Sequence, residues 1–448
     1  MIKMIRFSGK IGRDSLFAEC FVISLLLMVS IRFSSYINII TLAFCLWVAL
    51  TKSHEAVLCL CLFLLSFLSV FKLGIGSGFS LFNFVMIAFL ARLLYEKRFR
   101  LPSGRMISAY ILCFYVLITG ISNGVTEPVS FVMFILIGLG LLGGKQKKIS
   151  LPRLTEYASG GVVMSSAIGC LRSFFPRIES LRGSARIKLD RGVYYYRFSG
   201  LFGNPNAYTV LPSVLLGIFL VLLIRKQLKA LDIFYAVLIL IFGLMSSSMS
   251  FVACVGVTFA AAAVIILRHK PKFIPLFFFA LAVLGIVLYC FRDSDFMQTV
   301  LHRLERMAME STESEDVAAD ITTGRTVVWG MYFQYFIEHP LRLLFGNGIG
   351  ANTRTIIGYE SHSTFIEMLF YLGIIGTVFY LITMWRLFSP NRFGRKRRDP
   401  ICYVPFLALF VRMSARCLLG SEQFFFLLLL AAVSVWSEGE RNRMLRRT

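Results

Sequence analysis

The sequence has few charged residues. Of its 448 residues only 16% are charged, whereas 57% are hydrophobic, and the mean hydropathy is +0.75. Soluble globular domains carry about 25% charged residues, so this composition excludes an ordinary soluble domain. Apolar runs recur from end to end, each about as long as the roughly 20-residue helix that crosses a bilayer. We therefore predict an all-α fold, a polytopic integral membrane protein.

The usual signatures of metal binding and of secretion are also missing. Ten cysteines lie mostly inside apolar runs, with no C-x-x-C pair and no Cys/His spacing that would hold zinc. They are expected to be small buried hydrophobic residues, and neither a metal nor a cofactor is expected. No small-residue cleavage site follows the basic N-terminal stretch, which predicts an uncleaved first helix.

Acidic residues are scarce as well. There are 24 of them against 47 Lys and Arg, which gives a formal charge of +23. In a soluble protein this excess would suggest nucleic acid, but the chain has no motif for DNA or RNA. Basic residues also collect in the cytoplasmic loops of membrane proteins, and we prefer that explanation.

The apolar runs predict about fourteen membrane-spanning helices. Their expected positions are 15–31, 35–51, 55–72, 78–95, 106–122, 128–143, 157–173, 206–224, 231–247, 249–267, 273–291, 363–386, 402–419 and 421–437. Alternate connections between them carry basic clusters at 97–105, 145–153, 225–229, 268–272 and 392–398, and a further cluster lies in the C-terminal tail at 441–447. This alternation predicts that both termini are cytoplasmic.

Two long connections, 174–205 and 292–362, fall on the outer side of this topology. They divide the chain into five parts, namely 1–173, 174–205, 206–291, 292–362 and 363–448. Within the longer one, the stretch VVWGMYFQYFIEHP predicts an amphipathic helix that ends before Pro340. No clear internal repeat is present, which disfavours a transporter built from two repeats.

The shorter outer loop is unexpectedly basic. It carries six basic residues against Glu179 and Asp190, namely Arg177, Arg182, Arg186, Lys188, Arg191 and Arg197. One explanation is that the loop pairs with the acidic stretch 305–320. The other is an anion site, because Arg matches phosphate geometry and the Asn204-Pro-Asn206 turn begins a helix whose N-terminus favours anions.

Arg325 follows Thr323 and Gly324 at the start of the predicted loop helix. It could be a surface residue, although a helix start disfavours a cation. A bound anion would remove that conflict. The nearby FGNGIG stretch is not preceded by a strand, so it is interpreted as a glycine-rich turn rather than a phosphate-binding loop.

His362 stands at the outer mouth of the helix that is expected to begin near Ser363. Histidine is the usual side chain for proton transfer near neutral pH, although a structural hydrogen-bonding role is the alternative. Glu360 and Glu367 lie close in sequence, and Glu367 could act as a base or orient one.

Arg412 and Arg416 are four residues apart, so they are expected on one face of a predicted span. An Arg in hydrocarbon costs at least about 2.5 kcal/mol, so it normally faces a cavity or a partner. Two alternatives remain open. The arginines could extend to the membrane surface and pair with a carboxylate, with Glu422 near Arg416, or they could contact a lipid-linked phosphate.

Four sequence elements together resemble the superfamily of Wzy-like O-antigen polymerases and WaaL-like O-antigen ligases. They are the Arg-Phe-x-Gly-x-x-x-Asn-Pro-Asn stretch from Arg197, the Gly-Arg-x-x-x-Trp stretch from Gly324, the His-Pro-Leu-x-x-Leu-Phe-Gly-x-Gly run from His339, and His362 with Ser363. These motifs cover roughly 190–380, and Ser363 stands where the family usually has Asn.

The resemblance implies a metal-independent membrane glycosyltransferase with a GT-C-like fold in the bacterial inner membrane, active on the outer face. The donor would be a glycan on undecaprenyl diphosphate, and a sugar hydroxyl of another lipid-linked repeat would attack it. His362, Arg325 and Arg197 are the expected catalytic residues. The expected diphosphate ligands are Arg197, Arg325, Arg191 and Arg416. Supporting positions are Asn204, Asn206, Glu367, Glu422 and Arg412.

Partners implied in the same way are the lipid-linked oligosaccharide, membrane lipid and a protein that regulates chain length. The nearest alternative is a ligase that moves the finished glycan to a lipid core. A flippase of lipid-linked sugar is a rival from another class, but it should carry charges along many spans. A purely structural scaffold would leave the outer arginines unexplained.

Overall fold

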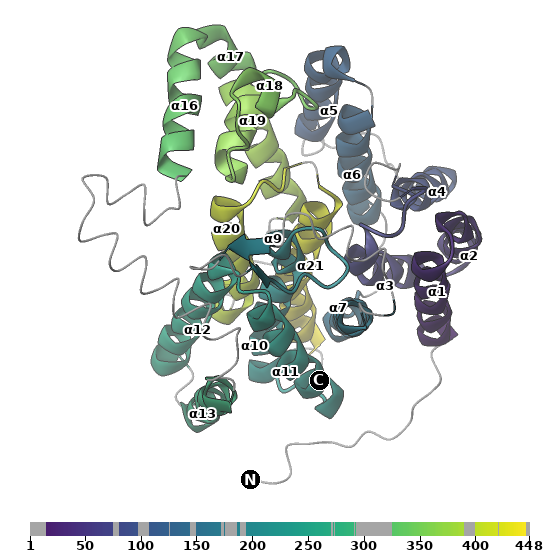
Figure 1. The fold of residues 1–448 in the computed structure, drawn as a ribbon, viewed down its shortest axis with the longest axis vertical. Helices are drawn as coiled ribbons and strands as arrows, with labels where there is room; N and C mark the ends of the chain where they lie inside the picture. The colour runs from purple at the N-terminus through teal and green to yellow at the C-terminus, as the bar shows by residue number, and fades with distance from the viewer. Residues whose placement is uncertain are drawn as a thin grey trace.

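The computed structural model describes residues 15–74, 80–96, 107–124, 126–143, 149–171, 186–188, 194–269, 274–290, 325–388, 399–419 and 421–444, with the single positions 174, 272 and 292. Helices dominate these residues (Figure 1). The first half contains α1 (Ser15–Arg32), α2 (Asn38–Thr51), α3 (His54–Leu64), α4 (Phe82–Tyr95), α5 (Ile107–Gly120), α6 (Thr126–Gly143) and α7 (Leu151–Cys170).

The second half continues this bundle and adds a group of helices at one end. Its elements are α9 (Pro205–Tyr208), α10 (Val210–Ile224), α11 (Ala230–Met245), α12 (Met249–His269), α13 (Ile274–Cys290), α16 (Arg325–Glu338), α17 (Pro340–Phe345), α18 (Thr353–Ile356), α19 (Thr364–Phe388), α20 (Val404–Ala415) and α21 (Glu422–Met444). Short 3-10 turns lie at η2 (Ser35–Ile37), η3 (Leu65–Phe67), η4 (Ile121–Asn123) and η9 (Pro400–Tyr403). Figure 1 shows α16, α17 and α18 together at the top of the molecule, beside the start of α19.

The core is apolar and contains whole helices. In α3 every residue from Ala56 to Leu64 is buried, and this helix packs against α7. Helix α10 is likewise buried along almost its whole length and packs against α11, α12, α20 and α21. Other helices, such as α5, leave large apolar side chains on the outside, including Phe114 and Ile118. Outward apolar faces around an apolar core fit a protein surrounded by lipid.

By length and composition, three helical stretches could each cross a membrane, namely Pro205–Ile224, Met249–His269 and Thr364–Leu387. Eight further apolar helices of 10 to 17 residues accompany them in the described chain. The chain is therefore an integral membrane protein built from apolar helices. The expectation of about fourteen spans, the GT-C-like fold and the five-part division of the chain stay predictions.

Each of the fourteen expected helices coincides with a helix of the structure, with shifted ends. The helix expected from 157 begins at Leu151, because the Ser150 hydroxyl accepts a hydrogen bond from the Arg153 amide at 3.4 Å and Pro152 occupies the first turn. Both features start helices. The helix expected over 402–419 ends at Ala415, and Arg416 has extended backbone angles (φ −152°, ψ 144°). Arg412 and Arg416 therefore do not share a helix face, and the prediction that they would is wrong.

The all-α prediction needs one addition in the basic loop. Strands β1 (Arg186–Lys188) and β2 (Tyr194–Tyr196) pair antiparallel, with Ile187 opposite Tyr195. This two-stranded ribbon ends one residue before Arg197, so it leads the chain directly to the first candidate site residue.

Helix α19 is broken at Gly373 (φ 63°, ψ −174°), where an unbroken span was expected. The break frees backbone carbonyls, and the FGNGIG turn satisfies them. The Asn347 amide donates to Phe370 O at 2.8 Å, and the Gly348 amide donates to Tyr371 O at 2.9 Å. The glycines of the turn have positive φ, as the interpretation of a turn requires. This contact joins α17 to α19 and so fixes the position of α16.

Candidate functional site

Arg197 lies at the start of the turn that leads into α9. Its side chain is only 9% exposed. Its Nε donates to the carbonyl of Ser246 at 2.9 Å, and its Nη2 donates to Oδ1 of Asn206 at 3.2 Å. The side chain of Asn204 caps α9 by accepting from the Asn206 amide at 2.8 Å. Of the two asparagines in the motif, Asn204 therefore shapes the turn and Asn206 orients the arginine.

Arg412 lies behind this turn and is completely buried. Its guanidinium donates to Oγ of Ser250 at 2.6 Å, to the carbonyl of Asn206 at 2.5 Å and to Oγ1 of Thr209 at 3.0 Å. All three acceptors are neutral, and Nε has no hydrogen-bond partner among the described residues. Arg412 thus neither extends to the membrane surface nor pairs with a carboxylate in the described chain.

Arg325 and His362 are brought together by α16. Arg325 is the first residue of this helix, as predicted, while Thr323 and Gly324 lie outside the described residues. One turn later, Nε1 of Trp329 donates to the carbonyl of Ser361 at 2.8 Å. This bond ties the start of α16 to the loop that carries His362.

The backbone of His362 is in the left-handed region, with φ of 51°. A residue other than glycine rarely adopts this conformation, and such residues cluster at functional sites. The neighbours hold the turn, because the Ser361 hydroxyl accepts from the Ser363 amide at 3.2 Å and donates to the Ser363 carbonyl at 3.0 Å. His362 lies just before α19, which begins at Thr364.

Arg416 reaches the same place from the loop between α20 and α21. The Thr364 hydroxyl donates to the Arg416 carbonyl at 2.6 Å and accepts from the Leu418 amide at 3.1 Å. Oε2 of the buried Glu367 accepts from the Leu419 amide at 3.2 Å. The start of α19 therefore holds the Arg416 loop, and Glu367 serves as an anchor for that loop.

Among the described residues, no carboxylate forms an ion pair with either arginine of this cluster. Burial lowers the pKa of Arg325, the nearby Cys417 opposes that shift, and the charge of Arg416 adds to it. In the described chain neither Arg325 nor Arg416 has an ion-pair partner, and the pair expected between Arg416 and Glu422 is not formed there. Two such cations that act on each other make a site suited to an anion.

The pKa of His362 is lowered, first by burial and then by the charge of Arg325. Glu360 opposes this shift, whereas Arg416 and Arg354 add to it. The imidazole is therefore neutral at pH 7 and can accept a proton. A neutral base beside two cations fits a reaction in which a hydroxyl is deprotonated while an anion leaves.

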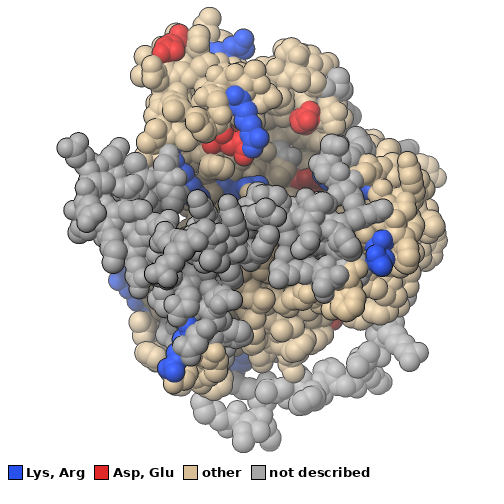
Figure 2. All heavy atoms as spheres, in the orientation of Figure 1, with Lys and Arg blue, Asp and Glu red and all other residues tan. Residues whose placement is uncertain are grey.

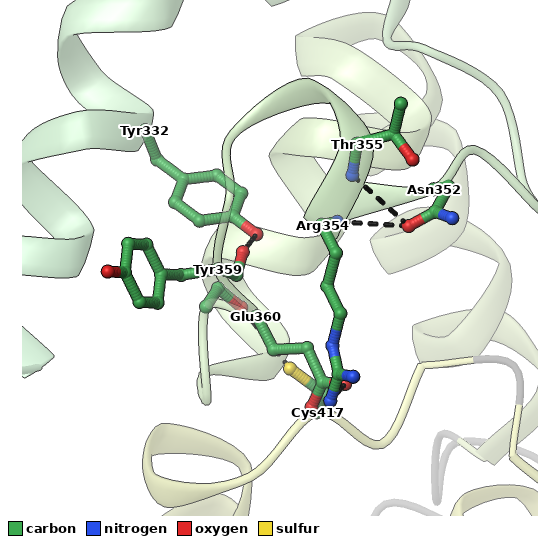
Figure 3. A network of polar contacts seen from close by, with 8 residues as sticks. Tyr332, Asn352, Arg354, Thr355, Tyr359, Glu360 and Cys417 are labelled. Atoms are coloured by element: carbon green, nitrogen blue, oxygen red, sulfur yellow. Dashed lines mark hydrogen bonds and ion pairs between the residues drawn. The ribbon is translucent and has the colours of Figure 1, made fainter.

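The outer edge of the site is a polar network (Figure 3). Nη2 of Arg354 pairs with Oε1 of Glu360 at 2.8 Å, and the Cys417 thiol lies 3.3 Å from the Ser361 hydroxyl. The Tyr332 hydroxyl donates to the carbonyl of Tyr359 at 2.8 Å, and Oδ1 of Asn352 caps α18. In Figure 2, basic and acidic side chains gather in a hollow below the end of the molecule that α16 to α18 form.

Several expected site features lie outside the described residues. They are Arg177, Arg182, Arg191, Glu179, Asp190 and the acidic stretch 305–320, while only the backbone is described at Arg186 and Lys188. The alternative in which the basic loop pairs with the acidic stretch stays a prediction. In the described ranges, no group of three or more His, Cys, Asp or Glu side chains could hold a metal ion.

Sequence reasoning missed the residues that connect the site. Ser248 donates to Oδ1 of Asn206 at 2.7 Å, and its hydroxyl lies 3.0 Å from that of Ser250. The signal was present, because SSSMS interrupts two apolar runs with four hydroxyl groups. Trp329 is visible in the sequence only as part of the Gly-Arg-x-x-x-Trp motif. Its hydrogen bond to the Ser361 carbonyl depends on the folded structure.

These elements define an integral membrane protein with an arginine-rich site at one end of a helical bundle. Residues 233–381 match the family model described as O-Antigen ligase. This segment of the chain is similar to that family, and the match is consistent with the superfamily that the motifs resemble. No curated protein sequence and no solved structure matches the chain.

Proposed function

We propose that the protein is a polysaccharide polymerase of the bacterial inner membrane. It transfers a glycan from undecaprenyl diphosphate to a sugar hydroxyl of another lipid-linked repeat, on the outer face of the membrane. The observation that carries this proposal is the convergence of Arg325, His362 and Arg416 from three separate segments. Their two cations have no ion-pair partner among the described residues and flank a neutral imidazole.

In the proposed reaction the acceptor hydroxyl oxygen attacks the anomeric carbon of the donor. The bond from that carbon to the diphosphate oxygen breaks, and the diphosphate leaves with the electron pair. His362 takes the proton of the attacking hydroxyl. Arg325 and Arg416, with Arg197 at the neighbouring turn, stabilise the charge that grows on the diphosphate. Arg191 is a further candidate ligand, and Asn206 and Glu367 hold the arginines and the loop in place.

The test is a deletion strain rescued with wild type, Arg197→Ala, Arg325→Ala or His362→Ala, with the surface glycan resolved as a length ladder. We expect only single-repeat glycan in the deletion strain and in the three variants, at normal membrane levels of protein. Arg342→Ala is the matched control, because Arg342 is an exposed arginine of α17, outside the site. A His362→Ala strain with wild-type polymer length and yield would show that His362 is not the base.

A ligase is the second candidate, since the matched family model is described as O-Antigen ligase. In that case long polymer would accumulate on the lipid carrier in the deletion strain. Repeats trapped on the cytoplasmic face would instead indicate a flippase and would overturn the proposed roles of the arginines. If the polymerase assignment holds, a chain-length regulator is the expected protein partner, on the strength of the family resemblance alone.

A further inference from the structure

We propose that Arg412 is a positioning residue for Arg197. It acts through Asn206, which lies between the two guanidinium groups. This inference rests on the proposed function, because it assumes that Arg197 binds the lipid diphosphate. Arg412 itself is fully buried and does not touch the substrate.

The first step of the argument is the double use of Asn206. Its backbone carbonyl accepts from Nη2 of Arg412 at 2.5 Å, while its side-chain Oδ1 accepts from Nη2 of Arg197 at 3.2 Å. One residue thus receives a hydrogen bond from each guanidinium. A shift of the Asn206 backbone would move the oxygen that orients Arg197.

A second route connects the same groups through hydroxyls. Nη1 of Arg412 donates to Oγ of Ser250 at 2.6 Å, and that hydroxyl lies 3.0 Å from Oγ of Ser248. Ser248 then donates to Oδ1 of Asn206 at 2.7 Å. The side-chain oxygen of Asn206 is therefore fixed both by its own backbone and by the start of α12.

The chemistry of Arg412 explains why this position requires an arginine. Its planar guanidinium reaches acceptors on two elements at once, with Ser250 on α12 and Thr209 beside Asn206 at the start of α10. A lysine has one ammonium group and cannot bridge such a set in fixed geometry. A buried cation whose hydrogen-bond partners among the described residues are all neutral is costly, so a role in the site explains it better than a role in stability.

The test is a double-mutant cycle on the purified full-length protein, with undecaprenyl diphosphate as the binding probe. We expect Arg412→Met to weaken binding about tenfold, with partial rescue in Arg412→Lys, which keeps the charge. In an Arg197→Gln background the same Arg412 changes should cause no further loss. If the losses of binding free energy from the Arg197 and Arg412 changes add in full in the double variant, the proposal is wrong. Unchanged binding in a folded Arg412→Met protein would also overturn it.

A milder variant keeps the proposal testable if the Arg412 changes prevent folding. Ser250→Ala removes one acceptor of Arg412, and it should weaken probe binding only when Arg197 is present. Ser414→Ala is the matched control, because the exposed Ser414 hydroxyl bonds within α20, to Val411 O at 2.8 Å. Equal binding by Ser250→Ala and wild type would overturn the proposal. If wild type itself does not bind the probe, the proposed function fails, and the proposal fails with it.

Discussion

At the scale of single residues, the charges around His362 decide when its imidazole can act. Arg325, Arg416 and Arg354 lower the pKa of His362 in addition to the effect of burial, and Glu360 raises it. Two of these groups, Arg354 and Glu360, pair with each other at the rim, where their side chains are 72% and 40% exposed. They offer a way to shift the pKa without removing the proposed catalytic groups.

We expect Arg354→Gln to move the acidic limb of the kcat/KM profile to higher pH. The reason is that the proposed reaction requires neutral His362, so that activity should fall as the pH drops through its pKa. Removing the Arg354 charge raises that pKa and leaves Glu360 unpaired, which acts in the same direction. The measurement is polymer formation against pH in proteoliposomes that contain the lipid-linked repeat.

Glu360→Gln provides the opposite change and should move the same limb to lower pH. Both shifts should shrink at high salt, because exposed charges are screened. If the two variants moved the limb in the same direction, or neither moved it, His362 would not be the group that titrates.

Arg416 offers a second comparison at this scale. Because Arg416 has no ion-pair partner in the described chain, Arg416→Ala removes a cation from the proposed diphosphate site and should lower kcat/KM by about a hundredfold. Glu422→Gln should leave it near wild type, because no ion pair joins Glu422 to Arg416 in the described residues. Similar losses in both variants would show that the two residues work as a pair.

At the scale of elements, the sequence was most informative about where helices lie. The apolar runs located all fourteen expected helices, because helices buried in lipid or in the core need apolar side chains. The apolar pattern before Pro340 located the loop helix α16. The break in α19 was not foreseen, because Gly373 sits in a continuous apolar run and only its contact with the FGNGIG turn makes it necessary. The convergence of Arg416 with His362 depends on hydrogen bonds from Thr364, which no spacing rule reveals.

Gly373→Ala should therefore disrupt the joint between α17 and α19. A Cβ at this position would collide with the carbonyl oxygen of Leu344 and the amide nitrogen of Gly346, and the backbone angles there favour glycine. The cost should be about 2 kcal/mol of stability, with loss of activity as α16 shifts. Thermal unfolding of the purified protein and the glycan ladder would measure both effects.

Gly330→Ala is the matched control for this change. Gly330 lies within α16, and a Cβ there meets nothing within 4 Å. Alanine favours helix, so α16 should keep or slightly gain stability, by up to about 1 kcal/mol. If the Gly373→Ala protein is as stable and as active as the Gly330→Ala protein, the contact between α17 and α19 at Gly373 is not needed for stability or activity.

At the scale of the whole molecule, the orientation in the membrane is the main prediction still to be tested. Cys170 at the end of α7 and Cys290 at the end of α13 are both exposed. The basic clusters predict that both helix ends lie on the outer side. A membrane-impermeant maleimide should therefore label the protein in spheroplasts, and most of the signal should disappear in the Cys170→Ser, Cys290→Ser double variant. If labelling requires permeabilised membranes, the two helix ends face the cytoplasm and the predicted topology is inverted.

The network around Asn206 has a consequence for how such proteins can be recombined. The family match covers 233–381, yet Arg197 and Asn206 precede it, and Arg412 and Arg416 follow it. The proposed active site thus combines residues from inside and outside the matched segment. A chimera that exchanged only the matched segment would combine Arg325 and His362 from one parent with Arg197, Arg412 and Arg416 from another. Donor specificity should therefore be inherited only when 197–209 and 404–422 are transferred with it.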